Sequence, residues 1–470
     1  MSQPSFSSDH VPTVGFVPAS FPRDPVEINQ FGEHMILGQI LEPLVEADRS
    51  GDTVPGLAES WHLSEDGKVL TFNLRKTAVF SNGAPVTAKD VKATLERNIH
   101  SKSQSANFIK NIVKVDATSL HVVVLHLHEH NVSLLKALSR DQLGILPAGW
   151  KFDSDSREPY VGSGAYRLVR EDGHWNLISN SKWPKSDKVA IKKWELAFLT
   201  SKNEVPEDVL PDYVPIATLA VKDAISKEKG YLADQHVVKE QVSFAQTSAW
   251  WYPHGVRYKD TAFQHLAMEV MRELIEIKSK SRGFERATGI VPVGVAGHLP
   301  EQVKVEKRVV APKERTKLKI AGFSGVFDFM IAGEDAKAIL EKYNVEPEMI
   351  PYLPPTLKNL KDQRPDIVMG SWAGGFNDPD GFLPLLNDLL DVDFVKYLGD
   401  MAPTYLEARE AQDWTTRSGL FRNFNRALIE KEMMVPGWKV QFFSITKKTF
   451  SETEVGFRYT PRFVNVKTVN

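Results

Sequence analysis

The stretch that most constrains this chain is Val54–Val91, which reads VPGLAESWHLSEDGKVLTFNLRKTAVFSNGAPVTAKDV. Within it, the residues of Val69–Leu74 alternate between two sets of side chains, which is the period of a two-faced strand. The Ser64–Gly67 segment before this strand has the composition of a hairpin tip. We therefore predict that Ser60–Leu63 pairs with Val69–Leu74 as a β-hairpin.

The end of the same stretch predicts a capped helix. A turn at Ser81–Pro85 is followed by Thr87, a favourable N-cap residue, and then by Asp90, which can bond back to the cap. Apolar residues recur after the cap at helical spacing, and the expected buried stripe is Val91, Leu95 and Ile99. Packing of the hairpin and the helix explains the aromatic residues of this stretch, so none of them is a candidate for catalysis.

Two further patterns predict elements elsewhere in the chain. Near the amino terminus, apolar residues over Ile36–Val45 recur at helical spacing, which predicts one helix over this range. In the second half, Lys317–Phe323 and Asp366–Gly370 are typical of strands, and Asp335–Tyr343 is typical of a helix between them. This alternation predicts an α/β region with partly parallel pairing.

The length and composition limit the number of subdomains and the kinds of partner and site that this chain can have. The 470 residues exceed the size at which one core stops growing, so we expect two or three subdomains. A net charge of −2 provides no field that would attract nucleic acid, and no apolar run has the length that spans a bilayer. The absence of cysteine excludes disulfides, thiolate metal sites and cysteine nucleophiles.

The amino-terminal residues bear on localisation. The opening segment, MSQPSFSSDHVPTVGF, lacks the positively charged region and the apolar core of a signal peptide. Two expectations stay open. Either the protein is periplasmic and its export signal is not part of this sequence, which we favour, or the protein stays in the cytoplasm.

Three alternating histidines raise the question of a metal site. His126 and His128 lie at the end of a predicted strand and His130 follows it, and alternate residues of a strand project from one face. Imidazoles on one face can bind zinc, nickel or copper. A metal site usually needs ligands from more than one element, so we favour a solvated strand face and expect neither a metal nor a cofactor.

Several phrases of the chain resemble one protein family. PGLAESW, DGKVLTFNLR and FSNGAPVTAKDV occur in an order that is similar to the bacterial extracellular solute-binding proteins of ABC importers, in the dipeptide-, oligopeptide- and nickel-binding group known as family 5. The resemblance continues in Tyr160–Tyr166, which reads YVGSGAY; this phrase lacks the Lys-Ser/Thr pair of a phosphate loop. The resemblance to this family implies an α/β, two-lobed periplasmic-binding-protein-like fold of the large class II type, with an extra subdomain in the larger lobe.

The resemblance also implies where the lobes begin and end. The boundaries are residues 1–45 for the first part of lobe I, 46–158 for the extra subdomain, 159–244 for the second part of lobe I, 245–440 for lobe II, and 441–470 for the return to lobe I. The two crossings between lobes are therefore expected near Ala245 and near Gln441.

Four aromatic residues are candidates for solute contact because of this resemblance. Phe21 follows the first strand at the cleft, Trp250 and Trp251 occupy an aromatic cleft strand, and Trp438 stands where relatives place cleft aromatics. Adjacent residues of a strand point to opposite faces. We therefore expect only one residue of the Trp250–Trp251 pair to contact solute and the other to lie in the core.

The segment Gly370–Phe382 provides the remaining candidates. Its acidic residues do not have the spacing of an EF-hand calcium loop. In the family, this segment carries an aspartate that holds the amino terminus of a bound peptide, and the corresponding position here is Gly375. The residues expected to contact solute are Trp372, Gly374, Gly375, Phe376 and Asp378.

The missing aspartate affects which solute the chain can hold. A hydrogen bond from a buried ammonium to a carboxylate contributes on the order of 1.5–3 kcal/mol, and an unpaired buried ammonium is penalised further. A free peptide amino terminus is therefore a poor ligand unless Asp378 or another acid replaces the anchor. Trp372 offers a flat apolar surface that suits a sugar ring, an aromatic group or a blocked peptide.

These inferences together predict a receptor. We expect a monomer that captures a peptide, a modified peptide or an oligosaccharide by closure of two lobes and delivers it to an ABC permease. No nucleophile, base and orienting group occur at a motif spacing, so we expect no catalysis. Two alternatives stay open: a sensory or regulatory protein with the same fold, and a hydrolase that uses Asp378 or Asp380 as an acid.

Overall fold

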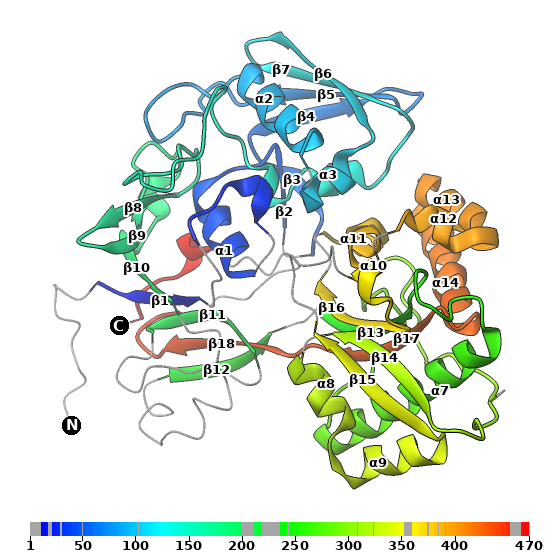
Figure 1. Ribbon diagram of the computed structural model, residues 1–470. Coiled ribbons are helices and arrows are strands. Elements are labelled where there is room, and N and C mark those ends of the chain that lie inside the picture. The colour runs from blue at the N-terminus through cyan, green and yellow to red at the C-terminus, as the bar shows by residue number, and fades with distance from the viewer. Residues whose placement is uncertain are drawn as a thin grey trace, which may run out of the picture. The chain divides into compact units, whose positions relative to one another are not determined.

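The computed structural model in Figure 1 describes most of the chain as two compact units. Unit 1 comprises Met1–Val242 with Gln441–Asn470, and unit 2 comprises Ser243–Val440. The described residues are 11–16, 21–28, 31–48, 50–101, 103–198, 211–218, 236–241, 245–307, 309–322, 324–351, 360–373, 376–383, 385–390, 392–451 and 462–469. The Pro-rich segment at 205–210 lies outside them.

Unit 1 contains a seven-stranded mixed sheet in the order β12-β18-β11-β1-β10-β9-β8. Its strands are β1 (Thr13–Phe16), β8 (Tyr166–Glu171), β9 (His174–Ser179), β10 (Lys193–Phe198), β11 (Tyr213–Thr218), β12 (His236–Gln241) and β18 (Phe442–Lys447). Strand β1 pairs in parallel with β10 on one side and β11 on the other. The remaining neighbours are antiparallel, so the parallel part of the sheet is centred on β1.

A second sheet of unit 1 has four strands in the order β4-β5-β7-β6. The strands are β4 (Ala58–Leu63), β5 (Val69–Leu74), β6 (Ile112–Ser119) and β7 (Val122–Leu127). The predicted hairpin is confirmed, because Leu63 lies opposite Leu70. The predicted helix is confirmed as α2 (Ala88–Ile99), and Thr87 and Asp90 form its capping box. The buried face of this sheet shares one hydrophobic core with Val91 and Leu95 of α2.

Shorter elements complete unit 1. They are α1 (Phe31–Ile40), β2 (Val45–Ala47), β3 (Thr53–Pro55), α3 (Gln104–Ile109) and α4 (Leu134–Ala137). The predicted helix over Ile36–Val45 is wrong at its carboxyl end, because α1 stops at Ile40. Pro43 explains the stop, since a proline cannot donate to the helical ladder and disfavours helical geometry in the residue before it. The apolar residues Leu41 and Leu44 are nevertheless buried.

The carboxyl-terminal segment returns to the seven-stranded sheet. Phe463 is fully buried, and its ring lies 5.7 Å from that of Trp194 and 5.8 Å from that of Tyr213. The neighbouring Arg462 pairs with Glu46 and donates to the backbone of α1. The last residues of the chain therefore pack α1 against the sheet.

Unit 2 contains a five-stranded sheet in the order β15-β14-β16-β13-β17. Its strands are β13 (Ala245–Trp251), β14 (Thr316–Gly322), β15 (Val345–Pro351), β16 (Ile367–Ala373) and β17 (Met434–Lys439). Strand β14 pairs in parallel with β15 and with β16, so the predicted parallel pairing is confirmed. The exposed edge strand β15 carries Pro347 and Pro351, which limit further pairing at that edge.

Helices follow and cover these strands in unit 2. They are α7 (Thr261–Arg282), α8 (Ser324–Ile331), α9 (Gly333–Lys342), α10 (Leu360–Gln363), α11 (Leu385–Leu390), α12 (Phe394–Leu398), α13 (Ala402–Glu410) and α14 (Trp414–Glu430). Leu266, Met271 and Leu274 of α7 pack into one core with the sheet residues Leu318 and Ile367. Helix α7 ends at Gly283, whose φ of 67° gives the left-handed cap that glycine adopts readily.

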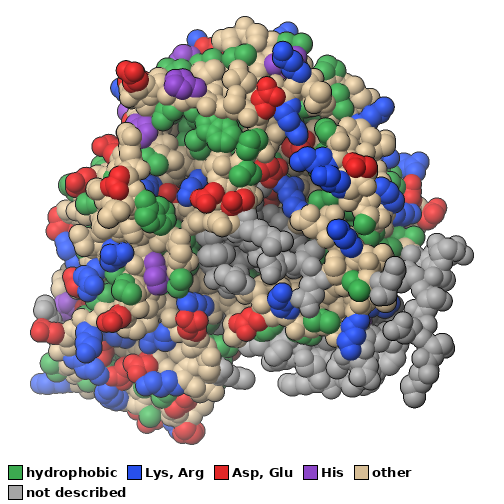
Figure 2. Space-filling model, turned by 180° about the vertical axis from the view of Figure 1, so that it is seen from behind, with side chains coloured by type: hydrophobic (Ala, Val, Ile, Leu, Met, Phe, Trp, Pro, Cys, Tyr) green, Lys and Arg blue, Asp and Glu red, His purple; other side chains and the backbone are tan. Residues whose placement is uncertain are grey.

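The described surface carries charges of both signs. Figure 2 shows lysine and arginine side chains interspersed with aspartate and glutamate over the visible face. Among the described helices, none combines the length and the apolar character that crossing a bilayer requires.

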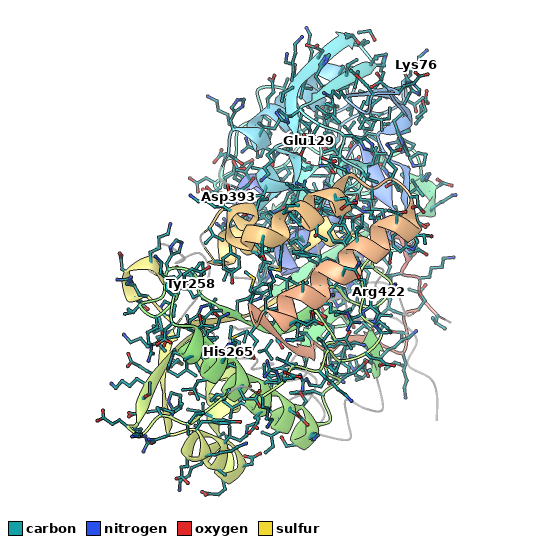
Figure 3. The ribbon with its side chains drawn as sticks, turned by 90° about the vertical axis from the view of Figure 1, so that its right-hand side faces the viewer. Lys76, Glu129, Tyr258, His265, Asp393 and Arg422 are labelled. Atoms are coloured by element: carbon teal, nitrogen blue, oxygen red, sulfur yellow. The ribbon has the colours of Figure 1, made fainter. Side chains whose placement is uncertain are left out.

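An ion-pair network covers the outer side of α7. Figure 3 shows His265 on this helix, and its ring pairs with Glu432. Two turns later, Glu273 accepts from Lys307 at 2.7 Å, from Lys342 at 2.7 Å and from the Tyr343 hydroxyl at 2.9 Å. Burial raises the pKa of Glu273, but these hydrogen bonds outweigh it and lower the pKa to about 2.

We predict that Glu273 makes the stability of unit 2 sensitive to acid. A carboxylate with a lowered pKa in the folded state contributes stability above its unfolded pKa, near 4.5, and loses it as the pH falls toward about 2. Glu273→Gln should therefore lower the urea midpoint at neutral pH. Between pH 4.5 and about 2, the urea midpoint of this variant should fall less steeply than that of the parent. The control is Glu334→Gln, whose side chain is 92% exposed. A Glu273→Gln midpoint that follows the parent at every pH would contradict the prediction.

Candidate functional site

The candidate site in unit 1 lies at the carboxyl end of β1. In open α/β sheets, ligands bind where the strand order reverses, outside the carboxyl ends of parallel strands. Strand β1 meets this condition, because two strands from later in the chain, β10 and β11, pair in parallel with it on opposite sides. Phe21 belongs to the segment that follows this strand end.

Phe21 takes part in a cluster that a tyrosine holds in place. Its half-buried ring lies 6.1 Å from the ring of Tyr160. Tyr160 is fully buried, and its hydroxyl accepts from the Arg23 N–H at 3.1 Å and donates to the Arg23 carbonyl. These bonds fix the segment after β1 to the segment around Tyr160, so the position of Phe21 is well defined.

The candidate site in unit 2 lies at the carboxyl ends of β14 and β16. Strand β14 is placed between β15 and β16, and all three run parallel, so the strand order reverses there. Trp372 is the penultimate residue of β16, where it pairs with Gln246 of β13. Gly374 and Gly375 follow immediately and lie outside the described residues. The placement of this segment at a strand end agrees with the general rule, while contact with solute stays a prediction.

The adjacent tryptophans of β13 lie on opposite faces of the sheet. Trp251 belongs to the hydrophobic core beneath α7, and its indole N–H donates to the Tyr258 carbonyl at 3.2 Å. Trp250 is also fully buried, and its indole N–H donates to the Ser248 hydroxyl at 3.0 Å. Trp251 thus lies in this core and Trp250 is also buried, and contact of either residue with solute stays a prediction.

Trp438 also lies in the core of unit 2. Its ring stacks on Phe284 at 5.8 Å and meets Phe329 edge-on at the same separation. The side chain is 7% exposed and shares the core that contains Trp251. Its ring thus packs between Phe284 and Phe329, and contact of Trp438 with solute stays a prediction.

Asp378 forms a buried ion pair with Arg417. The guanidinium donates to one carboxylate oxygen at 2.6 Å and to the other at 3.2 Å, and both side chains are at most 4% exposed. Arg417 also donates to the carbonyls of Ala408 and Arg409 at 2.7 Å. Asp378 therefore neutralises a buried cation, and its contact with solute stays a prediction.

Asp380 has a similar environment. Arg409 donates to it at 2.9 Å, and the Tyr405 hydroxyl lies 3.4 Å away. Burial, together with the neighbouring Asp380 charge, raises the pKa of Tyr405 well above its usual range. Phe376, on the same segment, is buried. Both aspartates proposed as hydrolytic acids thus direct their oxygens to arginines within unit 2.

The sequence contains a signal for this pairing. The buried stripe of α14 consists of Arg417, Phe421, Phe424 and Leu428 at helical spacing. An arginine in register with an apolar stripe must find an anion, because an unpaired buried charge is strongly unfavourable. The acidic residues after β16 were the available partners.

The three histidines of unit 1 do not converge. His126 lies 2.9 Å from Asp116 on the neighbouring strand, whereas His128 is exposed near Glu129. The ring of His130 lies against Gly67 in the hairpin tip. Within the described part of the chain, no group of three or more potential ligands is placed to hold a metal ion.

The fold and the two strand-end segments define a class of protein. The chain has the fold of the two-lobed periplasmic binding proteins. The structure of the Escherichia coli murein tripeptide binding protein MppA matches it with a TM-score of 0.79, over 98% of this chain and 99% of that chain, at 16% identity. A dipeptide binding protein from Pseudoalteromonas sp. SM9913, in complex with Met-Leu, matches with a TM-score of 0.78 over 97% and 100%, at 17% identity.

Sequence comparison finds similarity to one family. The profile described as "Bacterial extracellular solute-binding proteins, family 5 Middle" matches residues 52–205. The periplasmic murein peptide-binding protein MppA of Escherichia coli K12 is 24% identical over 416 residues, which cover 78% of this chain and 76% of that protein. The nickel-binding periplasmic protein of the same organism is 33% identical over 194 residues, which cover 36% and 35%. These matches confirm the predicted resemblance: residues 52–205 fit the family 5 model, and the chain is similar over most of its length to a periplasmic binding protein.

We predict that the Asp378–Arg417 pair is structural. Asp378→Ala leaves a buried guanidinium without its carboxylate, so it should cost about 3–5 kcal/mol of unfolding free energy. The double variant Asp378→Leu/Arg417→Met should recover most of this loss, since apolar replacement of a whole buried pair is often neutral. Urea denaturation measures both effects.

The matched control is Asp400→Ala, which breaks an exposed ion pair with Lys431. An exposed pair contributes at most about 1 kcal/mol. If Asp378→Ala is no more destabilising than this control and instead abolishes solute binding, Asp378 is a ligand anchor.

Proposed function

We propose that this chain is the solute-binding receptor of an ABC-type importer and that it acts in the periplasm. The observation that supports the proposal is the match of residues 52–205 to the family 5 model, together with a fold that corresponds to binding proteins over nearly the whole chain. Relatives are named as periplasmic binding proteins. Candidate segments at strand ends in both units are consistent with this role.

The solute we propose is of medium size and lacks a free amino terminus. One relative is named as a murein peptide-binding protein, and one solved structure with the same fold is a dipeptide binding protein in complex with Met-Leu. In this chain the anchor position is Gly375, and the nearby Asp378 and Asp380 are paired with arginines. A blocked peptide or an oligosaccharide requires no carboxylate partner for an ammonium, so either suits this environment better than a free peptide.

Recognition without turnover is the proposed output. The resemblance implies that two lobes close on the solute and that a permease recognises the closed state. Such closure requires only that the solute has a higher affinity for the closed state. We propose a monomer, because capture of this kind needs one chain.

Native mass spectrometry of the purified protein tests the proposal directly. We expect a co-purifying solute of defined mass that is released unchanged on unfolding. Thermal-shift screening of blocked peptides, free peptides and oligosaccharides then ranks the solute classes, and incubation with the same panel checks for turnover. Hydrolysis of any member of the panel would contradict a receptor without catalytic activity.

We predict that Trp372→Ala weakens solute binding with little change in the melting temperature of the empty protein. The reason is its position at the carboxyl end of β16, where an aromatic residue can contribute a flat contact surface. Calorimetric titration with the identified solute measures the affinity. Unchanged affinity would exclude this residue from the site.

We predict that Gly375→Asp creates a preference for peptides with a free amino terminus. A charge-assisted bond of about 1.5–3 kcal/mol corresponds to a gain of about tenfold or more for a free dipeptide over its acetylated form. The matched control is Gly374→Asp, which places the same charge one residue earlier. Equal effects of the two substitutions, or none, would show that position 375 is not the anchor position.

A further inference from the structure

Four aromatic residues of unit 1 form a cluster that includes one residue of the segment after β1. We name Phe21, Trp150, Phe152 and Tyr160 the aromatic platform. The Tyr160 ring lies 6.1 Å from Phe21, 6.2 Å from Trp150 and 6.1 Å from Phe152. Tyr160 is fully buried and the other three rings are half-buried, so the cluster has a buried base and a partly exposed outer layer.

The platform is assembled from segments far apart in the chain. Phe21 comes from the segment after β1, while Trp150 and Phe152 come from the segment that precedes β8. The Trp150 ring is nearly parallel to that of Tyr160, at 18°, and its indole N–H donates to the Pro159 carbonyl at 3.2 Å. Hydrogen bonds therefore fix the orientation of both rings, and the platform is preorganised.

The charged groups around the platform have partners. Arg97 lies 5.1 Å from the Trp150 ring and pairs with Asp24. Arg23 lies 3.8 Å from Glu27 and 3.5 Å from Glu33. The Tyr160 hydroxyl is engaged with the Arg23 backbone, and burial raises its pKa, so it stays neutral. The Arg97 guanidinium thus lies over the Trp150 ring, while Phe21 and Phe152 contribute half-buried rings that carry no charge themselves.

We infer that the aromatic platform is a subsite for an uncharged ring of the solute. It borders the strand end at which an open α/β sheet binds ligands. Aromatic faces bind flat groups by stacking and by excluding water, and ring pairs contribute beyond the area they bury. The shared chemistry is the apolar face of a ring, which an aromatic side chain or a pyranose can supply. This inference rests on the proposed function, because it names a chemical class for the same solute.

Fluorine NMR of protein labelled with fluorotryptophan tests the subsite without knowledge of the natural solute. The chain has ten tryptophans, and Trp150→Phe assigns the signal of Trp150. The ring probes are N-acetylphenylalaninamide and methyl glucoside, and N-acetylalaninamide is the probe without a ring. We expect a saturable shift of the Trp150 signal with a ring probe, and the probe that causes it identifies the source of the ring.

Trp414 provides the internal control, because it is 52% exposed and begins α14 in unit 2. Its signal should not respond to the ring probes. The inference is overturned if neither ring probe shifts the Trp150 signal, if the probe without a ring shifts it equally, or if Trp414 responds in the same way.

Substitutions provide a second, independent measurement. Phe152→Leu keeps apolar volume but removes a ring, so the affinity for the active ring probe should fall about three- to tenfold. Trp414→Leu should leave that affinity unchanged. Equal affinities for the parent and Phe152→Leu would overturn the inference.

The two proposals fail in different ways. A captured solute without any response of Trp150 would refute the subsite and leave the receptor standing. A response of Trp150 in a protein that captures no solute would refute the receptor and leave the ring site standing.

Discussion

Parallel strand pairing is the constraint on which the rest of this structure depends. Two parallel strands cannot be joined by a tight turn, so the chain must cross over and begin each strand at the same edge. In unit 1 this gathers strand ends around β1, and in unit 2 it gathers them around β14. Each unit thus acquires one edge at which loops from distant parts of the chain converge, and the candidate residues follow these strand ends.

The cost of desolvating charge explains much of the arrangement at these edges. Arg417 reaches the segment after β16 from α14 and pairs with Asp378 there, while Arg97 pairs with Asp24 near the aromatic platform. A buried charge without a partner would be strongly unfavourable. Both strand-end regions therefore contain many ionisable groups and yet have their described acids and bases paired with one another.

This pairing connects the proposals for the two units. The acids near the strand end of unit 2 pair with arginines, and in unit 1 the Arg97 guanidinium that lies over the Trp150 ring pairs with Asp24. Each unit, considered by itself, favours ring faces and neutral polar groups of a solute over a terminal ammonium. The fold is shared with binding proteins for several kinds of solute, so chemistry at these positions, rather than the fold, distinguishes one solute from another.

The sequence by itself determined the local elements and the resemblance to family 5. The hairpin at β4–β5, the Thr87 cap and the parallel region of unit 2 were predictable, because turn residues, caps and periodicity act within a few residues along the chain. Only the tertiary structure decided that Trp251 and Trp438 belong to a core, that Arg417 neutralises Asp378, and that Phe21 joins Trp150 through Tyr160. These outcomes depend on partners that are tens to hundreds of residues away. Burial and charge compensation are properties of the packed whole, and no local pattern specifies which distant side chain will supply them.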